Sequence, residues 1–274
     1  MKFGLCCSPQ VLGFSDSSFQ NNIKRLQDAG ADYLEFGVGV TLPEGDENDW
    51  KTLRSALNGA PLKVEAFNSF LPAHQRITGP EVNLQGVLEY SRVALNRCRE
   101  LGGEVVVLGS AGARKVPEGF DATRAQEQFV EFCRALGPVA ADAGITICIE
   151  PLNHKEDNLI LSVEHGAHIV DEVAHPNIQL LADLYHIEIE GEPLENVAQA
   201  GARIRHSHLA DTDRVAPGYA ENSKADFTGF FAALRAAEST SDLRCSFEGS
   251  YTDIFEQAAP LLQMMRERYE ESKS

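Results

Sequence analysis

Four potential metal ligands each end a short hydrophobic segment of the chain: Glu150, Asp183, His208 and Glu248. Taken singly, each has an ordinary structural explanation, because a polar residue at the end of a strand can cap a helix or form a surface ion pair. Four consecutive strands that all end in this way are harder to explain. If these strands are neighbours in a parallel sheet, their ends converge, and three carboxylates with nothing between them repel strongly. A divalent cation would resolve that repulsion.

The donor types narrow the choice of cation. Three carboxylates and one imidazole form a hard site, which favours Mn²⁺, Mg²⁺ or Co²⁺ over the thiolate-rich geometry of structural zinc. We expect one divalent ion, and the donor types alone do not choose between Mn²⁺, Mg²⁺ and Co²⁺. His206 shares a strand face with His208 but lies one inward position deeper. We therefore interpret His208 as the ligand and His206 as an interior residue, and the reverse assignment stays open.

The cysteines suggest no competing metal site. The sequence has 6 cysteines, and neither a CxxC pair nor a Cys/His ligand spacing occurs among them. Four lie inside apolar, strand-like runs: Cys6, Cys7, Cys148 and Cys245. Buried, reduced thiols are the expectation.

Eight strand-like segments alternate with longer segments of helical periodicity, and these elements must position the four ligands. The strand-like segments are Lys2–Cys7, Asp32–Val38, Leu62–Asn68, Glu104–Ser110, Ile145–Glu150, Ile178–Asp183, Ile204–Leu209 and Arg244–Glu248. Gly30, Gly102 and Gly144 stand at helix-to-strand turns, where glycine suits a left-handed backbone. The alternation implies parallel strand pairing, and 274 residues suit one closed barrel of about 250 residues. We predict a single-domain (β/α)8 TIM barrel over residues 1–274, with a doubly wound open sheet as the second choice.

The fifth segment tests the barrel prediction, because side chains alternate between the faces of a strand. Ile145, Ile147 and Ile149 share one face, which we expect to meet the helices. Thr146, Cys148 and Glu150 share the other face. Glu150 would then be the last inward residue at the C-terminal mouth, where barrel enzymes place their chemistry.

The charge balance excludes some classes of partner. With 41 acidic residues against 24 Lys and Arg, the formal net charge is -17, so the chain repels polyanions and we expect no nucleic-acid partner. The N-terminus lacks the apolar stretch of a signal peptide, and no segment reaches the roughly 20 apolar residues of a membrane span. We expect a cytoplasmic protein without a membrane partner. Gly37-Val38-Gly39 lacks the third glycine of a dinucleotide fingerprint, so no nicotinamide cofactor is predicted.

Longer motifs around the four ligands resemble those of a known family. The segments are Ile149-Glu150-Pro151-Leu152-Asn153, Ala182-Asp183-Leu184-Tyr185-His186, His206-Ser207-His208-Leu209-Ala210-Asp211 and Phe247-Glu248-Gly249. They resemble the xylose-isomerase-like TIM barrels, and within them the sugar phosphate isomerase/epimerase group that includes D-tagatose 3-epimerase, D-psicose 3-epimerase and hydroxypyruvate isomerase. The likeness covers nearly the whole chain. Together, the four motifs are specific to this superfamily, but they say much less about which substrate is bound.

The resemblance implies a role for each matching position. The implied metal ligands are Glu150, Asp183, His208 and Glu248, and Glu150 and Glu248 would also exchange protons as the catalytic pair. The implied substrate contacts are Glu156, His186 and Arg214.

Other interpretations of the substrate contacts stay open from the residues alone. Arg214 could form an ion pair with Asp211 or Asp213 at the surface, which would contribute little to the stability of the fold. His186 could be a capped loop histidine. Many relatives have Asn-Arg where this chain has Asn153-His154, which puts the neighbouring substrate contacts in doubt but leaves the metal site unaffected.

The resemblance implies a divalent-metal-dependent epimerase or isomerase that acts on a keto sugar or small hydroxy-ketone through a metal-stabilised cis-enediolate. The alternatives are an inosose-type dehydratase and a hydroxypyruvate-type isomerase. Two further functions are less favoured. An abasic-site endonuclease needs a basic surface, which the net charge of -17 argues against. A non-catalytic sugar-binding barrel has no need of two proton-transferring glutamates, and this chain has both Glu150 and Glu248. The expected partner is a small-molecule keto sugar, and relatives associate as homodimers or homotetramers.

Overall fold

The computed structural model describes residues 1–237 and 243–273 of the chain. Its strands are β1 (Lys2–Cys6), β2 (Tyr33–Gly37), β3 (Val64–Asn68), β4 (Val105–Leu108), β5 (Thr146–Ile149), β6 (Ile178–Asp183), β7 (Ile204–Leu209) and β8 (Arg244–Phe247). Each pairs in parallel with the next, and β1 pairs with β8, so the sheet closes into a barrel in chain order. The predicted (β/α)8 fold is confirmed.

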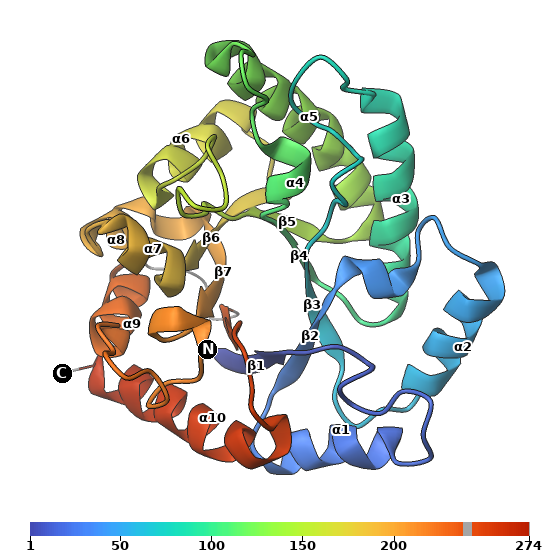
Figure 1. The fold of residues 1–274 in the computed structure, drawn as a ribbon, viewed down its shortest axis with the longest axis vertical. Helices are drawn as coiled ribbons and strands as arrows, with labels where there is room; N and C mark the ends of the chain where they lie inside the picture. The colour runs from blue at the N-terminus through green and yellow to red at the C-terminus, as the bar shows by residue number, and fades with distance from the viewer. Residues whose placement is uncertain (238–242, 274) are drawn as a thin grey trace.

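Helices connect the strands and surround the barrel as a ring (Figure 1). They are α1 (Phe19–Asp28), α2 (Glu47–Leu57), α3 (Leu84–Glu100), α4 (Ala111–Arg114), α5 (Ala122–Ala143), α6 (Val163–Val173), α7 (Leu184–Glu190), α8 (Glu195–Ala200), α9 (Phe227–Ala236) and α10 (Ile254–Glu271). Three short 3-10 helices complete the set: η1 (Val38–Thr41), η2 (Gly201–Arg203) and η3 (Thr212–Arg214). Gly30, Gly102 and Gly144 all have positive φ, at 103°, 103° and 68°, as predicted for the turns that end α1, α3 and α5.

The strands are shorter at some ends than the apolar runs that predicted them. Pairing stops at Cys6 in β1, at Ile149 in β5 and at Phe247 in β8. Glu150 and Glu248 therefore lie one residue beyond the ladder, although each still donates its backbone N–H to the neighbouring strand. The chain leaves the sheet here, at the C-terminal mouth.

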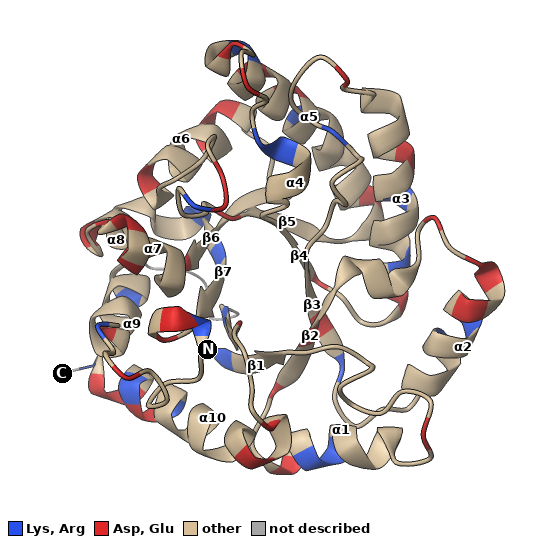
Figure 2. Ribbon diagram, viewed as in Figure 1, with Lys and Arg blue, Asp and Glu red and all other residues tan. Residues whose placement is uncertain are grey.

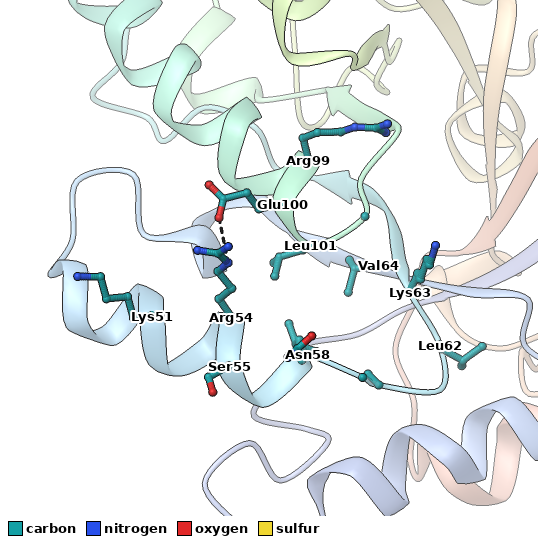
Figure 3. A pocket seen from close by; sticks show the side chains of 14 residues that line it. Lys51, Arg54, Ser55, Asn58, Leu62, Lys63, Val64, Arg99, Glu100 and Leu101 are labelled. Carbon is teal, nitrogen blue, oxygen red and sulfur yellow. Dashed lines mark ion pairs between the residues drawn. The ribbon is translucent and has the colours of Figure 1, made fainter.

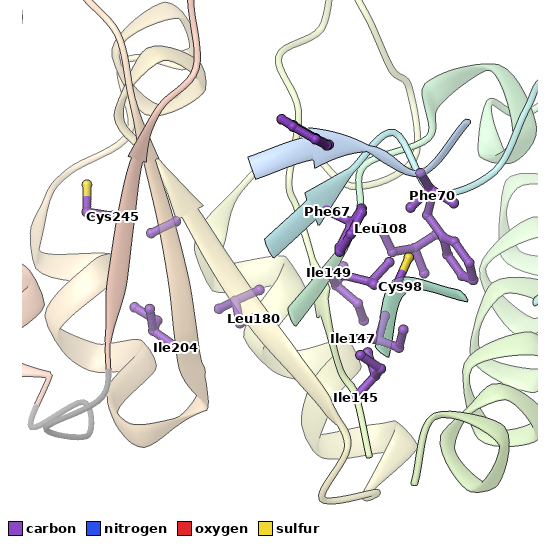
Figure 4. Packing of buried hydrophobic residues seen from close by; sticks show 14 of the residues in the cluster. Phe67, Phe70, Cys98, Leu108, Ile145, Ile147, Ile149, Leu180, Ile204 and Cys245 are labelled. Atoms are coloured by element: carbon purple, nitrogen blue, oxygen red, sulfur yellow. The ribbon is translucent and has the colours of Figure 1, made fainter. Parts of the chain in front are cut away.

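Two clusters of buried hydrophobic residues lie on the two faces of the sheet. The larger cluster fills the space between strands and helices and includes Ile145, Ile147 and Ile149, which Figure 4 shows grouped near Leu108 and Cys98. A smaller cluster, formed by Tyr33, Ala66, Val105, Val107, Cys148 and Leu181, contains the opposite face of β5. The alternation predicted for β5 is confirmed.

All six cysteines lie within the described residues and are free. Cys148 and Cys245 are buried as expected, whereas Cys6 and Cys7 are only partly buried. The expectation of full burial was wrong for these two, because β1 ends at Cys6 and the chain leaves the sheet at this point.

Charged residues lie mainly along the outer helices, where acidic positions alternate with Lys and Arg positions (Figure 2). Within the described residues, no helix is both long and apolar enough to cross a bilayer.

Candidate metal centre and sugar site

The barrel brings the four predicted ligands together at its C-terminal mouth. Glu150, Asp183, His208 and Glu248 each place one ligand atom within 4.8 Å of the others. Glu150 follows β5, Asp183 ends β6, His208 lies in β7 and Glu248 follows β8. Adjacent strands in chain order thus deliver all four side chains to one rim.

Asp183 has a structural role and an unused oxygen. Its Oδ1 accepts a hydrogen bond of 2.9 Å from the Tyr185 N–H and caps α7. Its Oδ2 is buried and makes no hydrogen bond within the described part of the chain. A buried carboxylate oxygen without a hydrogen bond is costly, so this atom and the clustered donors fit a hard divalent cation. Asp183 can therefore cap α7 with one oxygen and offer the other to a cation.

Glu35, on β2, links the two histidines of β7 beneath this cluster. Nε2 of His208 lies 2.9 Å from Oε1 of Glu35, and Nε2 of His206 lies 2.9 Å from Oε2. Nδ1 of His208 faces Glu150 Oε1 at 3.1 Å and Glu248 Oε2 at 3.6 Å. His208 therefore lies beside Glu150 and Glu248, whereas His206 lies deeper in the barrel against Glu35.

The carboxylates give the two histidines opposite pKa shifts. Burial lowers the pKa of His206 and outweighs its attraction to Glu35. Burial also acts against the charged form of His208, but the charges of Glu35 and Glu248 and a hydrogen bond to Glu150 prevail, so the His208 pKa lies well above its ordinary value. This shift favours the imidazolium form of His208, whose positive charge would offset part of the negative charge of the carboxylates.

The two glutamates at the mouth differ in their electrostatics. Burial raises the pKa of Glu248 to about 7, and the Glu150 charge adds to the rise while His208 and Arg214 oppose it. Burial also acts to raise the pKa of Glu150, but the hydrogen bond and charge of His208 outweigh burial and lower it. One carboxyl group thus favours its protonated form more than the other.

The three predicted substrate contacts surround the same cluster. His186, on α7, is 3% exposed, and its Nδ1 accepts hydrogen bonds from the backbone and side-chain nitrogens of Asn153 at 3.2 and 2.8 Å. The ring proton must then lie on Nε2, which is 3.5 Å from Asp183 Oδ2. His186 is therefore not merely a capped loop histidine, because it presents a donor to the site. Asn153 also donates to Glu156 Oε1 at 3.0 Å.

Arg214 points into the mouth rather than toward its neighbours in sequence. It forms ion pairs with Glu248 and, at 3.4 Å, with Glu156 Oε1, and its guanidinium lies 5.1 Å from the centre of the Tyr185 ring. Asp213 and Arg214 both have positive φ, at 65° and 56°, a strained conformation for residues with side chains. This turn directs Arg214 toward the barrel axis.

Sequence reasoning missed the roles of three residues. Asn68, at the end of β3, donates to Glu248 Oε1 at 2.8 Å. Gly109 follows β4, and a Cβ atom there would lie 2.2 Å from Oε2 of Glu150, so only glycine leaves room for that carboxylate. Glu35, on β2, could have been noticed in the sequence. It is a charged residue inside an apolar run, and such residues are rarely buried without a partner.

The loop after β5, which carries Asn153 and Glu156, has a buried anchor. Arg114 and Asp157 form an ion pair of 2.8 Å and are both fully buried. Arg114 also donates to the Leu108 carbonyl at the end of β4 at 3.1 Å. In contrast, His154 is exposed and pairs with Glu190 of α7. The loop is thus fixed to the barrel at Asp157 and open to solvent at His154.

A second, wider cleft lies away from this cluster. It measures about 680 Å³ and is lined by Lys51, Arg54, Lys63 and Arg99, among others, between α2, α3 and the start of β3 (Figure 3). A smaller cavity of about 230 Å³ adjoins the mouth and includes Tyr185 and Asp213. The chemistry-bearing residues are at the mouth, so the larger cleft is not the candidate site.

Comparison with known proteins agrees with this geometry. The sequence profile of the xylose isomerase-like TIM barrel family matches residues 23–267. The L-ribulose 3-epimerase of Methylomonas sp. is 38% identical over 101 residues, which are 36% of this chain and 34% of that enzyme. The 3-dehydro-D-guloside 4-epimerase of Escherichia coli is 30% identical over 168 residues, which are 57% of this chain and 61% of that enzyme. Both alignments span less than two thirds of the relative's length.

A solved structure matches over the whole barrel. D-psicose 3-epimerase from Clostridium cellulolyticum H10, determined with D-tagatose, has a TM-score of 0.80, with 98% of this chain and 99% of that chain covered. The sequence identity is 18%, so this similarity shows a shared fold.

Proposed function

Because this chain belongs to the xylose isomerase-like TIM barrel family, we propose that it is a divalent-metal-dependent epimerase of a free keto sugar, with a ketose 3-epimerase reaction as the first choice. The observation that carries the proposal is the cluster of Glu150, Asp183, His208 and Glu248, whose ligand atoms lie within 4.8 Å of one another. The names of the two curated relatives, both sugar epimerases, support it.

The two glutamates are the proposed proton carriers. They extend from β5 and β8, the first and last of the four ligand-bearing strands, and so can approach a bound sugar from two sides. One carboxylate would remove the proton from the carbon beside the carbonyl, and the other would return a proton to the opposite face. Their opposite pKa shifts are typical of a base and acid pair.

Other residues of the site would bind and orient the sugar. Nε2–H of His186 and the guanidinium of Arg214 would donate to hydroxyl or carbonyl oxygens, and Glu156 would accept from a further hydroxyl. Mn²⁺, held by the four ligands, would supply a Lewis acid that stabilises negative charge on the sugar oxygens.

A substrate panel in deuterated water tests the proposed reaction. The metal-free protein is supplied with Mn²⁺ and incubated with ketohexoses, ketopentoses, a 3-keto glucoside, hydroxypyruvate and inosose. We expect a free ketose to yield its 3-epimer with deuterium at the inverted carbon, detected by NMR. Enone absorbance from inosose would instead identify a dehydratase, and nicking of an abasic duplex would identify an endonuclease. Either result without ketose turnover contradicts the proposal.

Metal binding is expected to release a proton. In the metal-free protein the carboxylates around His208 raise its pKa and so favour a proton on Nδ1, which a cation at that atom would have to displace. The affinity for Mn²⁺ should rise with pH, by up to about tenfold per pH unit below the His208 pKa. Calorimetry in two buffers of different ionisation enthalpy measures the proton count. An affinity that does not change between about pH 6 and pH 8 would contradict this prediction.

A further inference from the structure

Glu35 is a fully buried carboxylate that none of the proposed roles at the mouth uses. It is 0% exposed and lies on β2, which is not one of the four ligand-bearing strands. Its oxygens receive three side-chain donors: Oε1 faces Nε2 of His208 at 2.9 Å, and Oε2 faces Nε2 of His206 at 2.9 Å and accepts from the Ser246 hydroxyl at 2.6 Å. Ser246 Oγ is in turn 2.7 Å from the Tyr33 hydroxyl.

The position of Glu35 determines which nitrogen of His208 faces the cluster. A carboxylate only accepts hydrogen bonds, so a proton must reside on Nε2 of His208. The lone pair of the neutral ring is then on Nδ1, the atom that faces Glu150 and Glu248. His206 packs edge-on against His208, with ring centres 4.9 Å apart, and the same carboxylate fixes it. Both rings are 0% exposed.

We propose that Glu35 is a positioning residue, which fixes the tautomer and orientation of His208 so that Nδ1 is presented to the cation. This inference rests on the proposed metal site. Hydrogen-bond partners of ligating histidines typically contribute 10- to 100-fold to metal affinity. The role of Glu35 lies in the hydrogen bond that its Oε1 accepts.

The Mn²⁺ dissociation constant of substitution variants, measured by calorimetry, tests this role without any substrate. Glu35→Met fills a similar volume but offers no acceptor, and we expect Mn²⁺ affinity to fall about 10- to 100-fold. Glu35→Gln keeps one acceptor oxygen, which can turn toward His208, and should recover most of the loss. Equal losses in both variants would assign the effect to the charge and overturn positioning by the hydrogen bond, as would wild-type affinity in Glu35→Met.

Two control variants separate positioning from packing. Ser246→Ala removes one donor to Glu35 but leaves the His208 bond. Glu65→Met removes another buried carboxylate, which pairs with Arg244 and Lys2, and Arg244 keeps its second ion pair with Glu104. Both should retain the wild-type dissociation constant. A wild-type protein that binds no Mn²⁺ would overturn the proposed function together with this inference, whereas Mn²⁺ binding that Glu35→Met leaves unchanged overturns this inference alone.

A spectroscopic measurement on the wild-type protein covers the case in which Glu35→Met does not fold. In the Mg²⁺-loaded, ¹⁵N-histidine-labelled protein, we expect an Nε2–H signal for His208 that is protected from solvent exchange. A proton found on Nδ1 instead would overturn the inference, because that nitrogen could not then face a cation.

Discussion

Replacement of either glutamate at the mouth, in Glu150→Gln and in Glu248→Gln, is expected to abolish deuterium exchange beside the substrate carbonyl. An amide cannot accept the carbon-bound proton, and general acid–base groups contribute about 10²- to 10⁴-fold to rates. Each variant also loses a charged donor of the four-residue cluster, so the loss should lie at the upper end of this range. NMR in deuterated water measures the exchange, with the ketose that the wild-type protein converts as the substrate.

A matched control for these variants is Glu44→Gln. Glu44 is an exposed glutamate that is hydrogen bonded to His74 and Gln75, outside the cluster, and its variant should keep wild-type exchange. Circular dichroism of the three variants would check that each is folded. Full exchange in both Glu150→Gln and Glu248→Gln would refute the proposed proton carriers.

Removal of the metal should be equally severe. Without a cation the developing charge on the sugar oxygens loses its Lewis acid, and a loss of about 4 kcal/mol corresponds to about 10³-fold in rate. Treatment with a chelator should therefore stop turnover, and added Mn²⁺ should restore it. The protein should also unfold at a lower temperature after chelation, because a ligand at 100 times its dissociation constant stabilises the folded state by about 2.7 kcal/mol. That difference corresponds to roughly 5 °C in Tm.

Asp183→Asn separates loss of the site from side effects of the chelator. The variant keeps an oxygen that can cap α7 as Oδ1 of Asp183 does but lacks the negative charge of the carboxylate. Its Tm should no longer rise on addition of Mn²⁺. Undiminished turnover by wild-type protein with metal analysis showing no bound ion would exclude the cation from the reaction.

The fold and the four clustered residues could be predicted because both depend on local patterns. Buried parallel strands appear as apolar runs, and the last inward residue of each run is fixed by alternation, as with Glu150 after Ile149. Because neighbouring strands of a parallel barrel end at the same rim, the order of the strands was enough to bring Glu150 and Glu248 together.

The contacts between distant strands could not be predicted in this way. Glu35 meets His208 only because the barrel closes and brings side chains from β2 and β7 together in its interior. The direction of Arg214 depends on positive φ angles at Asp213 and Arg214, which neither residue type favours. From sequence, Asp211 and Asp213 were therefore plausible ion-pair partners for Arg214. In the structure, Arg214 instead pairs with Glu248 and Glu156.

The anchored loop after β5 has a consequence for protein engineering. Arg114 and Asp157 hold its base in the interior, while His154 is exposed to solvent and pairs with Glu190. Libraries randomised at His154 and its neighbour Lys155 can therefore explore altered sugar preference while the scaffold is preserved. Libraries that include Asp157 will yield mostly unfolded clones, because a buried guanidinium left without its carboxylate costs about 3 to 5 kcal/mol.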